Sequence, residues 1–306
     1  MSAIQLIWSP AIHLISCGIN VLGNKWDKTC QFLDVWSECY KVMKPGAFLL
    51  AMGATRTYHN LASDIESCGF QIKDCLIWAY TEGFPRGKDI GKQITDAENS
   101  QKWNGWNTTL KPSYEPIVVA SKRLEGNYVE NVLKYNVGGI NIDECRIPYE
   151  SEEDMKSIGS FDNFAGTDRG DSRFFSANTG GKKQVNINPK GRYPANLVYF
   201  DSLFPGTYDK FFMVPKPSNS EKIGLTHDTV KPFKLFHRLI KMFSPKPSIV
   251  KSNVVVLDPF CGTATTGIAC MDLGRDFIGF EIDAKICEEA KCRIKNTNKK
   301  IDLFES

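Results

Sequence analysis

The spacing of apolar residues predicts alternating strands and helices in the first third of the chain. Residues 4–8 and 47–52 are continuous apolar runs of strand length, and residues 70–80 supply a third strand. Between them, apolar residues recur at three- and four-residue steps over 30–43 and 57–67, which is the spacing of helices with one buried face. Strands that alternate with helices build a mostly parallel sheet with helices on both faces, so we predict an α/β fold.

The same alternation returns in the last third of the chain, where it is more regular. We find no internal repeat that would make this block a copy of the first. The further predicted elements are strands at 116–120, 208–214, 253–257 and 277–280 and helices at 230–243, 265–273 and 284–296.

The stretch between these blocks has a different composition. Residues 138–194 are rich in Gly, Asn, Ser, Asp and Lys, which is typical of loops. A chain of 306 residues accommodates one large domain or a core with one sizeable insertion. We therefore divide the chain into one half of an α/β core (1–137), a loop-rich insertion (138–200) and the other half of the same core (201–306).

Composition and charge exclude several classes of protein. Hydrophobic residues make up 42% and charged residues 24%, which rules out a disordered or fibrous chain. Ten cysteines without a Cys-x-x-Cys pair predict reduced thiols in the cytoplasm and no metal site. The apolar run 4–22 lacks the basic flank of a signal peptide, and no run reaches the length of about 20 residues that a membrane span needs.

The distribution of charge along the chain says more about possible partners than the net charge does. The formal net charge of +3 neither proves nor forbids a polyanionic partner. Between Leu203 and Lys251, however, nine basic residues face three acids, an excess that suits a surface facing phosphates, although a solvated helix face explains part of it. The nine are Lys210, Lys216, Lys222, Lys231, Lys234, Arg238, Lys241, Lys246 and Lys251.

The strongest chemical signal is a glycine turn between the predicted strand at 253–257 and the helix at 265–273. Such a turn directs backbone N–H groups and the positive end of the helix toward a ligand. Asp258 ends the strand, Gly262 lies in the turn, and Glu281 ends the next strand, about 20 residues on. A carboxylate at that distance binds two ribose hydroxyls in folds of this kind, which predicts a nucleoside ligand.

The turn discriminates among nucleoside ligands. The GxxxxGK[ST] pattern that holds nucleoside triphosphates is absent. The G-x-G-x-x-G pattern of dinucleotide enzymes is also absent, because Ala264 stands where a second glycine would let a pyrophosphate approach. A nucleoside without phosphates is the ligand that these residues favour.

These residues resemble a known family. Asp258-Pro-Phe-Cys-Gly-Thr-Ala-Thr-Thr-Gly267 resembles the Asp-Pro-Phe-x-Gly-Ser-Gly-Thr-Thr motif of S-adenosylmethionine-dependent DNA amino-methyltransferases, which modify adenine N6 or cytosine N4. Thr226–Pro232 resembles that family's His-Pro-Thr-x-Lys-Pro segment, and Leu273–Asp283 resembles its Leu-Gly-Arg-x-Phe-Ile-Gly-x-Glu segment. Upstream segments resemble the compact phage-type members, and the order of motifs matches the circularly permuted subgroup.

The resemblance implies a function and a set of site residues. It implies a Rossmann-like methyltransferase fold that binds S-adenosylmethionine and double-stranded DNA, needs no metal, and methylates a base amine, adenine N6 in preference to cytosine N4. Residues 1–137 would hold the catalytic half, 138–200 the DNA-recognition segment and 201–306 the cofactor half. A partner restriction enzyme and the oligomeric state are not implied. The expected cofactor residues are Asp258, Phe260, Gly262, Thr265, Glu281, Lys231 and Pro232.

The catalytic loop departs from the family pattern of Asp/Asn/Ser-Pro-Pro-aromatic. Aligned by its strand, the chain offers Ser9 and Pro10 as catalytic residues, followed by Ala11 and Ile12 where proline and an aromatic ring are expected. A stacked aromatic is worth about 1–3 kcal/mol per base. Two hypotheses follow: an active methyltransferase, with cytosine N4 gaining weight if Ser9-Pro10 is the true loop, or a catalytically impaired relative that keeps the fold and its binding sites.

Overall fold

The computed structural model describes residues 3–8, 32–80, 87–149, 151–157, 188–199, 212–213, 230–250 and 253–302. They form an eight-stranded sheet in the order β6-β5-β3-β4-β2-β1-β7-β8. The strands are β1 (Ala3–Trp8), β2 (Phe48–Met52), β3 (Gln71–Ala79), β4 (Tyr114–Ser121), β5 (Leu197–Tyr199), β6 (Phe212–Met213), β7 (Val254–Asp258) and β8 (Asp276–Gly279).

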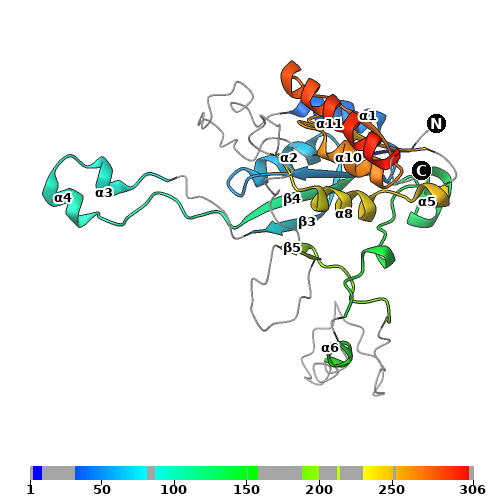
Figure 1. Cartoon of the computed structure of the whole chain (residues 1–306), viewed down its shortest axis with the longest axis horizontal. Coiled ribbons are helices and arrows are strands. Elements are labelled where there is room, and N and C mark those ends of the chain that lie inside the picture. Colours follow the sequence, from blue (N-terminus) through cyan, green and yellow to red (C-terminus); the bar gives the residue numbers. More distant parts are fainter. Residues whose placement is uncertain are drawn as a thin grey trace.

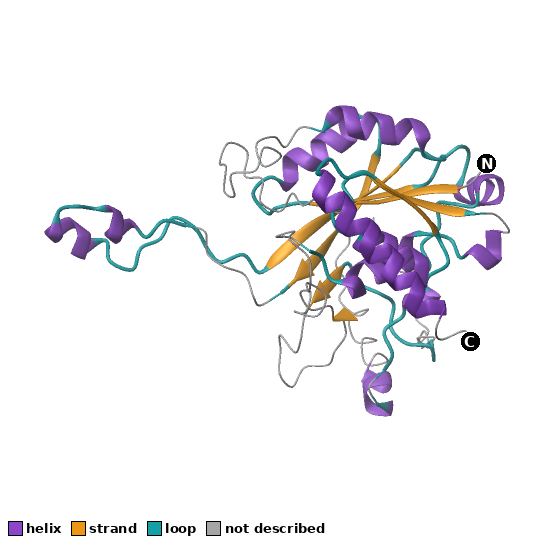
Figure 2. Cartoon of the chain, turned by 45° about the horizontal axis from the view of Figure 1, so that its top comes forward, coloured by secondary structure: helices purple, strands orange, loops and turns teal. Residues whose placement is uncertain are grey.

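Helices cover both faces of this sheet (Figure 2). They are α1 (Leu33–Val42), α2 (Tyr58–Ser67), α3 (Ile90–Gln93), α4 (Ala97–Lys102), α5 (Tyr128–Tyr135), α6 (Glu152–Ser157), α8 (Phe233–Phe243), α9 (Pro247–Val250), α10 (Thr265–Asp272) and α11 (Ala284–Asp302), with a 3₁₀ turn η2 (Asp143–Cys145). Within the described residues, no helix combines the length and apolar character that crossing a membrane requires.

The sheet is mostly parallel, as predicted. β1 lies between β2 and β7 and runs parallel to both, and β7 runs parallel to β8. β4 is the exception, because it is antiparallel to both of its neighbours, β2 and β3. β2 and β3 therefore point the same way as β1 and β7, and the carboxyl ends of all four strands meet at one edge of the sheet.

Alternation along the strands explains the two layers. In β2, Phe48, Leu50 and Met52 pack with α8 and α10 in one core cluster, whereas Leu49 and Ala51 pack with α1 and α2 in another. Successive strand residues face opposite sides of a sheet, so a strand covered on both sides is apolar throughout. All five residues of β2 are accordingly buried.

An arm formed by residues 87–113 projects from the core between β3 and β4 and carries α3 and α4 (Figure 1). Asp89 and Asp96 cap its two short helices, each carboxylate accepting a backbone N–H from the helix that it precedes. The rings of Trp103 and Trp106 lie 5.2 Å apart and are 43% and 60% exposed. The sequence pattern predicts no helix in this arm.

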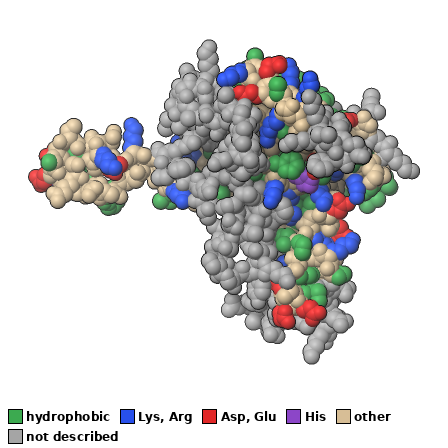
Figure 3. Space-filling view, in the orientation of Figure 1, with side chains coloured by type: hydrophobic (Ala, Val, Ile, Leu, Met, Phe, Trp, Pro, Cys, Tyr) green, Lys and Arg blue, Asp and Glu red, His purple; other side chains and the backbone are tan. Residues whose placement is uncertain are grey.

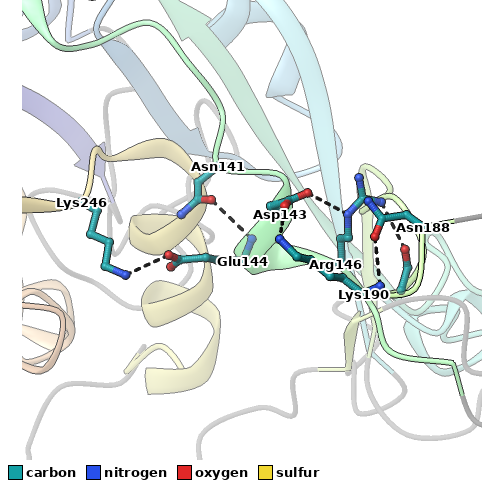
Figure 4. Close-up of polar contacts among 8 residues, drawn as sticks. Asn141, Asp143, Glu144, Arg146, Asn188, Lys190 and Lys246 are labelled. Atoms are coloured by element: carbon teal, nitrogen blue, oxygen red, sulfur yellow. Dashed lines mark hydrogen bonds and ion pairs between the residues drawn. The ribbon is translucent and has the colours of Figure 1, made fainter. Parts of the chain in front are cut away.

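The two ends of the insertion are fastened to the core and to each other. Arg238 of α8 donates to the carbonyl of Cys145 at 2.9 Å, and Lys246 pairs with Glu144 at 3.0 Å (Figure 4). Ile147 and Arg192 form a backbone bridge in both directions. Residues 197–199, at the end of the predicted insertion, pair with β3 as part of the core sheet. The boundaries of the three segments otherwise stay a prediction.

Candidate cofactor site

The site is built on the turn that follows β7. Asp258, the last residue of β7, is fully buried, and its Oδ1 accepts the backbone N–H of Phe260 at 3.1 Å. Its Oδ2 accepts the hydroxyl of Thr266 on α10 at 2.6 Å. One carboxylate therefore joins the strand end, the turn and the first turn of the helix.

The turn has an unusual backbone. Gly262 has φ 51° and Ala264, at the start of α10, has φ 60°. Glycine adopts this left-handed conformation freely, but for a residue with a side chain it costs about 1–2 kcal/mol. Ala264 is 1% exposed, so the turn keeps this conformation inside the core.

Glu281 lies directly across from the turn. The register pairs Asp258 with Gly279, and the ladder continues as Phe280 N–H donates to the Asp258 carbonyl at 2.9 Å. The Oε2 of Glu281 accepts the N–H of Gly262 at 3.0 Å, and Oε1 accepts the N–H of Asp283 at 2.9 Å. The structure thus brings together Asp258, Gly262 and Glu281, which the sequence placed on consecutive strand ends.

A residue that the sequence analysis missed holds the turn from the other side. The Nη1 of Arg293 on α11 donates to the Thr263 carbonyl at 3.1 Å, the Thr263 hydroxyl at 3.2 Å and the Thr265 hydroxyl at 2.9 Å. The Thr265 hydroxyl in turn reaches the carbonyl of Lys231 at 3.5 Å. Thr265, expected to be a cofactor residue, therefore uses its side chain within the protein.

Lys231 and Pro232 border the same region from the start of α8. Pro232 is buried and occupies the N-cap position of that helix. The Nζ of Lys231 pairs with Oε2 of Glu115 on β4 at 2.8 Å, and the two side chains are 5% and 10% exposed. The ammonium also lies 5.4 Å from the centre of the Trp78 ring. The Lys231 side chain thus fastens the start of α8 to the sheet, whereas the Lys231 carbonyl contacts the Thr265 hydroxyl of the turn.

Phe260 and Cys261 are packed residues of the turn. The Phe260 ring meets Phe32 edge-on at 5.0 Å and lies 6.3 Å from Trp36, so it fills space between the turn and α1. Burial, reinforced by the Asp258 and Glu281 carboxylates, raises the pKa of the Cys261 thiol to about 12. A thiol that stays protonated is a poor nucleophile, so we interpret Cys261 as a structural residue.

The predicted catalytic residues, Ser9 and Pro10, lie outside the described residues and follow β1 directly in the sequence. Among the residues that the structure describes, no group of three or more His, Cys, Asp and Glu is arranged for a metal.

The basic excess between Leu203 and Lys251 is largely used within the protein where the structure describes it. Four of its five described cations contact protein groups: Lys231 on Glu115, Arg238 on the Cys145 carbonyl, and Lys241 and Lys246 on Glu144. Lys234 is exposed. Figure 3 accordingly shows acidic and basic side chains interspersed over the described part of that face. The inference of a phosphate-facing surface therefore has little support from these five residues.

Known proteins are similar to this chain in sequence. The chain is 24% identical over 258 residues to the type II methyltransferase M.HindIII of Haemophilus influenzae, covering 82% of this chain and 64% of that one. It is 31% identical over 150 residues to M1.MboII of Moraxella bovis, covering 49% and 46%. The solved complex of M1.HpyAVI with SAM is 18% identical and covers 95% of this chain and 88% of that chain, with a TM-score of 0.48.

The extent of these matches defines what they show. The chain spans less than two thirds of the length of these two curated relatives. The model of the DNA methylase family, in contrast, matches residues 22–292, which include the turn at Gly262 and the acid at Glu281. The chain therefore belongs to the DNA methylase family that comprises N6 and N4 methyltransferases.

Proposed function

We propose that this protein binds S-adenosylmethionine at the turn after β7 and transfers its methyl group to an exocyclic amine of a base in double-stranded DNA, adenine N6 in preference to cytosine N4. The observation that carries the proposal is the contact between Glu281 and Gly262, which sets a carboxylate against a glycine turn at the end of two parallel strands. Membership of the DNA methylase family and the names of the relatives support it.

The residues of the turn have the properties that a nucleoside requires. Glu281 offers two carboxylate oxygens, and each now accepts a backbone N–H. A carboxylate so placed can accept two ribose hydroxyls, because each oxygen has a second lone pair. The bound sulfonium would supply the electrophilic methyl group. The part of the protein is to hold the nucleoside and align it with the amine.

We expect the predicted catalytic residues to lie at the same edge of the sheet as the turn. β1 and β7 are neighbouring parallel strands, so Trp8 and Asp258 end at one edge of the sheet, and Ser9 follows Trp8 in the sequence. The arm at 87–113 follows β3 and leaves from this edge too. A base flipped from the duplex could meet both cofactor and catalytic loop there. The Ser9 hydroxyl would accept a hydrogen bond from the amine.

Titration calorimetry and a methyl-transfer assay test this proposal together. The wild-type chain should bind S-adenosylmethionine and incorporate tritiated methyl groups into unmethylated duplex DNA, and mass spectrometry of the digested DNA should identify N6-methyladenine. Glu281→Gln should weaken cofactor binding by about tenfold or more, because the charged acceptor is lost. Glu288→Gln, which removes an exposed acid of α11, is the matched control.

The outcomes separate the rival functions. Cofactor binding without methyl transfer to any DNA would favour the alternative of a catalytically impaired methyltransferase. The absence of an aromatic residue after Pro10 supports that alternative. N4-methylcytosine in the digest would correct the target base. Failure of the wild-type chain to bind the cofactor, or equal binding by wild type and Glu281→Gln, would refute the proposed site.

A further inference from the structure

We propose that Arg293 is a positioning residue for the cofactor site, an inference that rests on the proposed function. Arg293 lies on α11, and its Nη1 donates to the carbonyl and hydroxyl of Thr263 and to the hydroxyl of Thr265. These acceptors flank Ala264 on both sides. One guanidinium nitrogen therefore fixes both neighbours of the residue that holds the left-handed conformation.

The turn depends on such a clamp because of the residue at 264. Ala264 has φ 60°, a conformation that a residue with a side chain leaves readily for the ordinary regions. The family motif that this turn resembles has glycine at that position, and glycine needs no support there. If Ala264 relaxed, the peptide groups before it would rotate, and the N–H of Gly262 would no longer face Glu281.

The contacts of Arg293 extend to another border of the site. The hydroxyl of Thr265, which Arg293 reaches at 2.9 Å, also lies 3.5 Å from the Lys231 carbonyl just before α8. The guanidinium thus links α11, the start of α10 and the start of α8. Arg293 acts on the ligand through the geometry of these segments, so it should affect cofactor affinity far more than the rate of methyl transfer at saturation.

Calorimetry with S-adenosylmethionine on five variants of the full chain, four single and one double, tests the inference. Arg293→Met should raise the Kd about tenfold, as expected for loss of charged hydrogen bonds. Arg293→Lys, which keeps the charge with different geometry, should give an intermediate loss. Lys291→Met removes a charge from the same helix, where Lys291 pairs only with Glu288 among the described residues, and should leave the Kd within twofold. In Ala264→Gly, the added Arg293→Met change should cost less than about threefold, because glycine adopts the turn without support.

A general loss of folding would give a different result. Circular dichroism and the thermal midpoint establish that each variant is folded at the titration temperature. If Arg293→Met does not fold, Thr265→Val, which removes one acceptor, replaces it with an expected loss of about threefold. Wild-type affinity in Arg293→Met, or an equal loss in the alanine and glycine backgrounds, would overturn the inference while leaving the proposed function standing. Absence of cofactor binding by the wild-type chain would overturn both.

Discussion

The buried ion pair between Lys231 and Glu115 permits a quantitative prediction. At 2.8 Å, two unit charges attract each other by about 6 kcal/mol at an effective dielectric constant of about 20. Desolvation offsets much of this gain, since the side chains are 5% and 10% exposed, yet removing one partner leaves the other charge buried. Such losses cost about 3–5 kcal/mol. Lys231→Met should therefore lower the free energy of unfolding by about 3 kcal/mol.

Urea unfolding followed by fluorescence and circular dichroism measures this loss. Lys234→Met is the matched control, because Lys234 is exposed three residues further along and should change the free energy of unfolding by less than about 0.5 kcal/mol. Replacing both partners, as Lys231→Met with Glu115→Leu, should recover most of the loss, since no charge is then stranded. A loss below about 1 kcal/mol in Lys231→Met, or a double variant as unstable as the single one, would refute the argument from burial.

Three further predictions concern the turn and its surroundings. Ala264→Gly should raise the thermal midpoint, with about 1 kcal/mol of added stability from relief of the left-handed alanine; a lower midpoint would contradict this. Gly267→Ala should lose about 1–3 kcal/mol in urea unfolding, because the new Cβ would lie 2.7 Å from the Phe277 ring, and an unchanged midpoint would show that the ring moves freely. Burial raises the pKa of Cys261 from 9.0 to about 12, so folding keeps a proton that the unfolded chain releases above pH 9. Stability should accordingly fall between pH 9 and 12, and less steeply in Cys261→Ala; identical slopes would argue against a buried thiol.

Long apolar patterns made most of the core predictable. β2 and β7 are buried throughout, and seven residues of α8, whose apolar residues recur at the helical period, are buried. The helices α3 and α4 were missed because segments of four and six residues are too short to show a helical period, although each is preceded by an aspartate cap that is visible in the sequence. The antiparallel direction of β4 has no signature in its composition either, since a strand buried on both faces reads the same in both directions.

Some residues of the candidate site were predictable from the sequence and others were not. Asp258, Gly262 and Glu281 were predictable because each lies at the end of a strand or shortly after it, where the backbone fixes its place. Arg293 and Glu115 were not, because their partners lie 28 and 116 residues away and neither residue stands in a local motif. The pairing of Lys231 with Glu115 also shows why a lysine within a motif need not contact a ligand.

The attachment of the insertion bears on how such proteins diversify. Two described segments that are distant in sequence are tied together, because Arg192 meets the carboxylate of Asp154 and pairs with the backbone of Ile147. These contacts are made by residues outside 158–187, so substitutions within 158–187 leave the contacting groups in place. We propose that 158–187 can therefore be exchanged as a cassette, with a change in DNA sequence preference and little change in the stability of the sheet.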